Sequence, residues 1–106
     1  MEDLSKTGHN YKLNNHENPK DYQLLQFIEK EAAPDGSGFV VVQDGTTNEE
    51  VLKMLIDRCQ KLNTKLPSKE TTVAIICLQE ALMHFNARTL KRQAQGVENT
   101  PLPHKD

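Results

Sequence analysis

Three cations lie close together near the end of the chain, in the stretch RTLKRQAQGVENTP at residues 88–101. Arg88 and Arg92 are four residues apart, so a helix would place both guanidinium groups on one face, where each can form paired hydrogen bonds to a phosphate. Cations in the last turns of a helix also interact favourably with its dipole, and that explanation suits Lys91 better. The spacing leaves two interpretations open, an anion-binding site and helix-end electrostatics.

Side chains that could transfer a proton occur in the same region. Glu80 and His84 are four residues apart, with Cys77 nearby. No nucleophile turn, HExxH motif or glycine-rich phosphate loop accompanies them, so we expect a protein that is not an enzyme. His9 and His16 have no cysteine pair at zinc-ligand spacing, and we expect neither a metal site nor a cofactor.

Two helices must position the cations. A helix over residues 69–95 is predicted to begin after Ser68 as its N-cap and to end before Gly96. A helix over residues 47–63 is predicted before it, because each threonine of GTTNEE is followed three residues later by a glutamate that completes a capping box. A short turn joins the two into an antiparallel helical hairpin. Apolar residues lie on more than one face of the later helix, which predicts self-association.

The rest of the chain is predicted to add less regular structure. Residues 1–19 are polar and are expected to be flexible. Residues 20–32 are predicted to form a helix that has Pro19 in its first turn. The β-branched run FVVVQ at residues 39–43 predicts one short strand, which would need a partner from another chain or from the N-terminal segment. Residues 101–106 are expected to be a tail.

The predicted fold is therefore mainly all-α. It is a single domain over residues 20–100, with a helical hairpin, an added N-terminal helix and one short strand. The chain has 106 residues, of which 36% are hydrophobic and 5% aromatic, with no Trp. Since so few apolar residues make only a small core, this composition favours a homo-oligomer. Cys59 and Cys77 are expected to be free thiols.

Charge and hydropathy exclude two classes of partner. The net charge of −2 does not give the broad basic face that a protein needs to bind a nucleic-acid duplex. No apolar run approaches the length of a membrane span, and the polar start MEDLSKTGHN is unlike a signal peptide. We therefore expect a protein without a membrane partner that lies in the cytoplasm.

Two segments, GTTNEEVLKMLIDR and KETTVAIICLQEALMHFNARTLKRQAQGVENT, carry a resemblance that covers residues 45–100. They resemble the helical-hairpin domain of phage anti-CBASS and anti-Thoeris sponge proteins. The resemblance implies a protein that sequesters a cyclic nucleotide or cyclic ADP-ribose signal of bacterial defence without changing it chemically. It also implies a homo-oligomer, such as a hexamer, with ligands held between subunits in the cytoplasm of the infected host.

The resemblance also implies ligand-binding residues. Arg88 matches the arginine of the family's Arg-Thr pair, and Arg58 is a weaker match that can pair with Asp57 instead. Asn48 belongs to a matched Thr-Asn-Glu run, while Thr71 stands where many relatives have Asn. An aromatic ring could stack on a base. The expected ligand contacts are Arg88, Arg92, Arg58, Thr71, Asn48, Phe39 and Tyr11. The alternative is a helical inhibitor of protein–protein interaction, or an accessory phage protein, without a nucleotide ligand.

Overall fold

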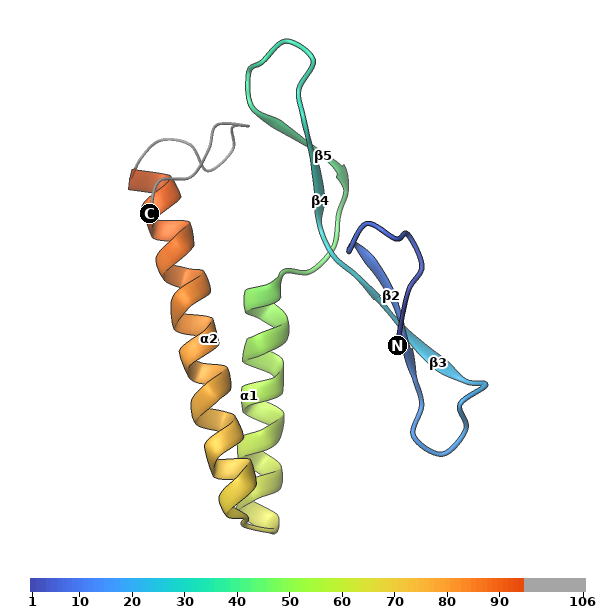
Figure 1. The fold of residues 1–106 in the computed structure, drawn as a ribbon, viewed down its shortest axis with the longest axis vertical. Helices are drawn as coiled ribbons and strands as arrows, with labels where there is room; N and C mark the ends of the chain where they lie inside the picture. The colour runs from blue at the N-terminus through green and yellow to red at the C-terminus, as the bar shows by residue number, and fades with distance from the viewer. Residues whose placement is uncertain (95–106) are drawn as a thin grey trace. The chain divides into compact units, whose positions relative to one another are not determined.

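The computed structural model describes residues 1–94, which divide into two compact units (Figure 1). The first unit, Met1–Thr47, contains two small antiparallel β-sheets, and the second begins at Asn48 and contains two helices. The predicted mainly all-α class is wrong, because the described residues form five strands as well as two helices. The fold is mixed α/β.

The first sheet has three strands in the order β1-β2-β3, formed by Glu2–Asp3, Asn10–Asn14 and Tyr22–Gln26. The flexible segment expected at residues 1–19 instead holds β1 and β2. The backbone of β2 pairs with that of β3 along its whole length, from Asn10 opposite Gln26 to Asn14 opposite Tyr22. These ladders order a polar N-terminal segment that has little apolar surface of its own.

The helix predicted at residues 20–32 is wrong, because β3 and β4 (Glu29–Ala32) occupy this stretch. Pro19 does not begin a helix but is the second residue of a β-turn, in which the Asp21 N–H donates to the Asn18 carbonyl oxygen at 3.0 Å. The φ angle of proline suits both positions equally well, so Pro19 alone does not choose between them. Pairing with β2 decides the conformation of this stretch.

The second sheet is the hairpin of β4 with β5 (Phe39–Gln43). β5 covers the same residues as the strand expected at 39–43, but its partner is β4 rather than another chain or the N-terminal segment. Residues 33–38 connect the two strands, and two glycines, Gly36 with φ 75° and Gly38 with φ 134°, allow the chain to reverse. Hydrogen bonds from the Ser37 hydroxyl and backbone N–H lower the pKa of the Asp35 carboxyl in this turn.

A backbone junction ties the two sheets together. The Phe27 N–H donates to the His9 carbonyl oxygen at 2.7 Å, and the Thr46 N–H donates to the Gln26 carbonyl oxygen at 2.9 Å. Gly45 precedes this junction, where a Cβ atom would lie 2.5 Å from the carbonyl carbon of Phe27. The missing side chain of Gly45 therefore permits the close approach of the two backbone segments.

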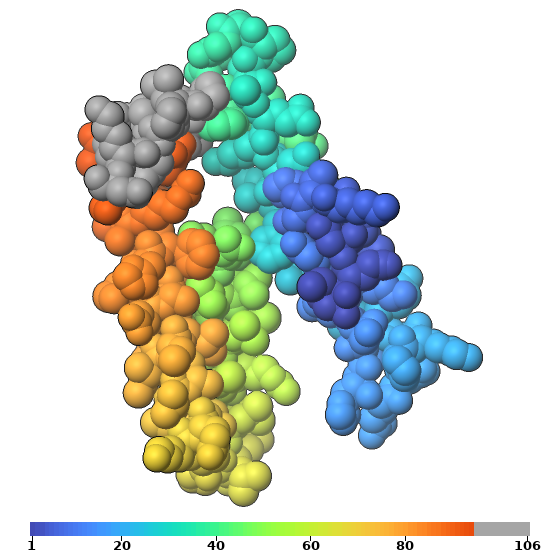
Figure 2. All heavy atoms as spheres, in the orientation of Figure 1, coloured from blue at the N-terminus to red at the C-terminus, as the bar shows by residue number. Residues whose placement is uncertain are grey.

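The second unit pairs α1 (Asn48–Lys65) with α2 (Lys69–Ala94). These helices correspond to those expected at 47–63 and 69–95. They run antiparallel from a short turn, and Figure 2 shows the side chains of α1 packed against those of α2. Among the described residues, Ile75 on α2 is the one apolar side chain that is buried, at 9% exposure. The pair of helices alone has a very small core.

Ser68 is the N-cap of α2, as the sequence predicts. Its hydroxyl oxygen accepts a hydrogen bond from the Thr71 N–H at 3.0 Å, which satisfies one of the free donors of the first turn. Asn63 of α1 reinforces this turn, because its side chain accepts from the Ser68 N–H at 3.0 Å and donates to the Thr72 hydroxyl oxygen at 3.1 Å. The turn is therefore fixed by side chains from both helices.

Candidate anion-binding site

The two arginines that could form an anion site lie in the last described turns of α2. Arg88 is exposed and Arg92 is half-buried, while Lys91 between them is exposed. Residues 69–94 are continuously helical, so the spacing of four residues does place the two guanidinium groups on neighbouring turns of one side. The expected helix end at Gly96 and the tail at 101–106 lie outside the described residues.

Arg88, like Arg58, is an exposed cation among the predicted ligand-binding residues. It forms no hydrogen bond or ion pair with any other residue in the described range 1–94, and its side chain is open to solvent. Its guanidinium group therefore keeps all of its N–H donors for an external partner. Such a planar fork matches two oxygens of a phosphate, whereas the ammonium group of a lysine acts as a point charge.

Asn48 lies at the same end of the helix pair as Arg88. Given a rise of about 1.5 Å per residue, Asn48 is about 25 Å and Arg88 about 30 Å from the turn that joins the helices. Arg58 lies on α1, about 15 Å closer to the turn by the same measure. Asp57 pairs with Lys61 at 2.9 Å, and among the described residues no ion pair joins Arg58 to Asp57.

Thr71 lies at the opposite end of α2 from Arg88, about 25 Å away along the axis. Its hydroxyl oxygen is 2.7 Å from the hydroxyl of the capping residue Ser68, from which it accepts a hydrogen bond. Within one chain Thr71 and Arg88 therefore cannot contact the same small ligand. In this structure Thr71 therefore takes part in the hydrogen bonds that cap the start of α2.

The two predicted aromatic contacts both lie in the first unit, on different sheets. Phe39 is half-buried in β5, where it pairs with Ala32 of β4. Tyr11 is half-buried in β2, and its ring meets the ring of Phe27 edge to face, with a centroid distance of 5.8 Å. Stacking on a ligand is easier for Tyr11, because it also lines a pocket.

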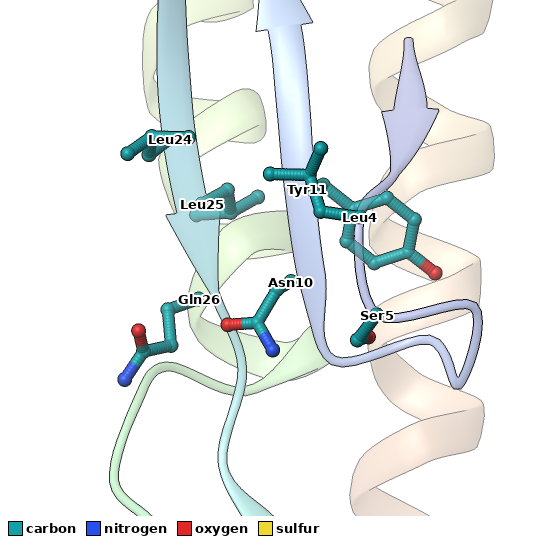
Figure 3. A pocket seen from close by; sticks show the side chains of 7 residues that line it. All are labelled: Leu4, Ser5, Asn10, Tyr11, Leu24, Leu25 and Gln26. Carbon is teal, nitrogen blue, oxygen red and sulfur yellow. The ribbon is translucent and has the colours of Figure 1, made fainter.

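That pocket has a volume of about 320 Å3 and lies on the three-stranded sheet (Figure 3). Leucine side chains and two amides line it together with Tyr11. The lining residues are Leu4, Ser5, Asn10, Tyr11, Leu24, Leu25 and Gln26. Apart from Tyr11, none of them was predicted from the sequence. The sequence signal for these residues is weak, because the pocket forms only when three strands of different segments come together.

The groups considered for catalysis form no developed site. The Glu80 and His84 side chains lie 3.9 Å apart on the exposed side of α2, and more than half of each is exposed to solvent. Cys77 is an exposed free thiol and Cys59 is a half-buried one. Among residues 1–94, no group of three His, Cys, Asp or Glu side chains is placed to hold a metal ion. Within that range, neither helix is long and apolar enough to cross a membrane.

Comparison with known proteins finds a phage protein that resembles part of this chain. The chain is 41% identical over 58 residues to Thoeris anti-defense 1 of Bacillus phage SBSphiJ7. The match covers 54% of this chain but only 41% of the phage protein, so this chain spans about two fifths of that relative's length. No protein-family model and no solved structure matches the chain. The chain is thus similar, over about half of its length, to an anti-Thoeris protein of a phage.

Proposed function

We propose that this chain is a phage anti-defence protein that binds and sequesters a signal molecule of the Thoeris system. The observation that carries this proposal is the 41% identity to Thoeris anti-defense 1, together with an arginine whose donors are unoccupied at the end of α2. The ligand class we propose is a cyclic nucleotide or a cyclic ADP-ribose, because both carry phosphates that a guanidinium group recognises.

Arg88 holds the phosphate in this proposal, and Arg92 supports it from the next turn. The end of α2 has no backbone N–H donors to offer an anion, since the free groups at a helix C-terminus are carbonyls. Side-chain donors must therefore supply the whole attraction and overcome the negative end of the helix dipole. Two arginines on one side of the helix supply this attraction better than a lysine would.

Affinity sets a further requirement. A sponge that competes with a nanomolar receptor needs about 12 kcal/mol of binding free energy. Phosphate contacts and stacking on an aromatic ring, at about 1–3 kcal/mol per base, supply only part of it. Enclosure of the ligand between subunits supplies the remainder, which is why we propose that the working form is a homo-oligomer.

No chemical turnover is proposed, because sequestration alone removes the signal. Glu80 and His84 are exposed, and a general acid–base pair works best in a site that holds the substrate away from water. The bound compound would then leave unchanged when the protein unfolds.

The proposal is tested by incubating the protein with cyclic dinucleotides, cyclic trinucleotides and cyclic ADP-ribose isomers, then measuring each compound in the filtrate. We expect the wild type to deplete at least one compound and Arg88→Ala to deplete none. Lys53→Ala removes an exposed cation of α1 and is the matched control, which should behave as wild type. If Arg88→Ala depletes the same compound equally, Arg88 does not hold it. If no compound is depleted, a protein partner replaces the signal molecule as the target.

A further inference from the structure

Two aspartates of the chain are each followed by a glycine, Asp35-Gly36 in the β4–β5 turn and Asp44-Gly45 after β5. In such a pair the backbone nitrogen of the glycine can attack the side-chain carboxyl of the aspartate and close a five-membered succinimide ring. Glycine favours this attack, because it has no side chain to screen its nitrogen and its backbone rotates freely. Both pairs are exposed to solvent, so their hydrogen bonds decide which of them reacts.

At Asp44-Gly45 the two reacting groups are already in contact. The Gly45 N–H donates to the Asp44 Oδ1 atom at 2.9 Å, so the nitrogen lies next to the carboxyl carbon that it would attack. No backbone acceptor within residues 1–94 holds this N–H elsewhere. A rotation of the carboxyl about its Cβ–Cγ bond turns its face toward the nitrogen. Reacting atoms that are held this close combine faster than the same atoms in a flexible chain.

At Asp35-Gly36 both reacting groups are occupied by other partners. The Gly36 N–H donates to the Ala33 carbonyl oxygen at 3.0 Å, and the Asp35 Oδ1 atom accepts from the Ser37 N–H at 2.9 Å. Hydrogen bonds from the Ser37 hydroxyl and N–H also lower the pKa of the Asp35 carboxyl, so less of it is present as the neutral acid. The neutral acid is the form that reacts, because it can lose its hydroxyl group as water. This pair is therefore protected.

We propose that Asp44 is a site of spontaneous covalent modification, at which the folded chain converts aspartate to isoaspartate through a succinimide with Gly45. The Gly45 nitrogen forms a bond to the Asp44 Cγ atom, the bond from Cγ to its hydroxyl oxygen breaks, and the hydroxyl leaves with the amide proton as water. Water then opens the ring. Attack at the side-chain carbonyl restores aspartate, whereas attack at the main-chain carbonyl leaves the chain linked through Cγ as isoaspartate. One water is lost and one is regained, so the mass does not change.

Isoaspartate at residue 44 would alter the junction between the two sheets. The chain becomes one methylene longer before residue 45, and the Asp44 carbonyl, which accepts from the Gln26 side chain at 2.7 Å, becomes a free carboxylate. Thr46 follows directly, and its N–H donates to the Gln26 carbonyl oxygen at 2.9 Å while its carbonyl oxygen accepts from the Ile28 N–H at 2.9 Å. We expect both backbone hydrogen bonds to weaken, which loosens the sheet unit at this point.

The modification requires neither a ligand nor a second copy of the chain. It is therefore independent of the proposed function, and a protein that captures no signal molecule should still form isoaspartate at residue 44.

Ageing of the whole chain tests the proposal. The folded protein is kept in mildly acidic buffer at physiological temperature, and isoaspartate is located by peptide mapping after labelling with a methyltransferase specific for this residue. We expect residue 44 to carry severalfold more isoaspartate than residue 35. In urea the hydrogen bonds of both sites are lost, and the excess at residue 44 should disappear. Equal amounts at the two sites of the folded chain, or no isoaspartate at residue 44, would overturn the proposal.

Two matched substitutions locate the reaction. Asp44→Glu keeps the carboxyl group but requires a six-membered ring, so the label in this peptide should be almost lost. Asp35→Glu is the control and should leave the label at residue 44 as in the wild type, with circular dichroism as the check that both variants fold. An Asp44→Glu chain that accumulates as much label in this peptide as the wild type would contradict the proposal.

Hydrogen exchange measures the structural consequence. The amides of Thr46 and Ile28 should exchange faster in the aged wild type than in the fresh protein, in proportion to the isoaspartate formed. Aged Asp44→Glu is the control and should exchange as its fresh form does. Equal acceleration in the aged wild type and in aged Asp44→Glu would show that isoaspartate at residue 44 is not the cause.

Discussion

Arg88 and Lys91 are both exposed cations of α2, but they offer a ligand different chemistry. The guanidinium group of Arg88 has a rigid set of N–H donors that no described residue occupies. The ammonium group of Lys91 is more strongly hydrated and serves the negative end of the helix dipole equally well from many positions. Geometry as well as charge should therefore decide which of them holds a phosphate.

Replacing Arg88 by lysine separates geometry from charge. Arg88→Lys keeps the positive charge but loses the paired donors, and we expect ligand affinity to fall about tenfold, which corresponds to about 1.4 kcal/mol. Equilibrium dialysis with the captured compound measures this change. Lys91→Arg is the complementary variant and should leave the affinity within about twofold of the wild type. An Arg88→Lys protein that binds as tightly as the wild type would show that charge alone suffices.

At the scale of elements, the start of α2 depends on one hydroxyl group. Ser68→Ala removes the acceptor of the Thr71 N–H and should lower the free energy of unfolding by about 1 kcal/mol. Urea denaturation followed by circular dichroism at the helical band measures the loss. Ser68→Asp keeps an acceptor at the cap and is the control, which should retain most of the stability. Loss of equal size in both variants would mean that the cap hydrogen bond is not the cause.

The junction between the sheets depends on Gly45 in a different way. Gly45→Ala would place a methyl group 2.5 Å from the carbonyl carbon of Phe27, so the junction must shift. We expect a destabilisation of about 1–3 kcal/mol, the usual cost of overpacking. Hydrogen exchange of the Thr46 and Ile28 amides should accelerate, because both donate in this junction.

Gly36→Ala is the control for Gly45→Ala, since a methyl group at Gly36 meets no atom within 4 Å. Its cost comes only from the φ of 75° and should be about 1 kcal/mol. Its effect should stay in the β4–β5 turn. Unchanged exchange at Thr46 in Gly45→Ala would contradict the close approach at the junction.

The helices could be predicted from the sequence, whereas most of the sheets could not. The signals for α1 and α2 are local, namely capping residues and an apolar stripe within each segment. β5 also has a local signal in its three consecutive valines. β3 has none, since Tyr22, Leu25 and Ile28 also recur at the spacing of one face of a helix. Its conformation depends on pairing with β2, which lies across a turn from a segment that contains few apolar residues.

For the same reason, some residues of the candidate site could be predicted from the sequence and others could not. Arg88 and Arg92 follow from spacing on a helix, and the structure places both on α2. The pocket that Tyr11 lines depends on three strands that no local sequence pattern predicts. Thr71 was predicted as a ligand contact together with Arg88 on the basis of sequence resemblance. Within one chain, however, the two residues lie at opposite ends of α2.

For the molecule as a whole, Tyr11 is the predicted ligand contact of the sheet unit that also lines a pocket, so it tests whether that unit takes part in ligand capture. Tyr11→Ala should weaken capture of the compound about tenfold, within the range of one lost base stack, while Tyr11→Phe should bind as the wild type does. Fluorescence titration measures the affinity, and circular dichroism checks that the sheet remains folded. Wild-type affinity in Tyr11→Ala would show that the Tyr11 ring does not stack on the ligand.

Heat release shows whether the protein captures its ligand and leaves it chemically unchanged. The wild type is incubated with the depleted compound, washed free of unbound material and denatured by heat, and the released compound is identified by mass spectrometry. We predict recovery of the input compound with unchanged mass and retention time, in a fixed ratio to protomers. Release of a cleaved or rearranged product would contradict the claim and make Glu80 and His84 the first residues to test.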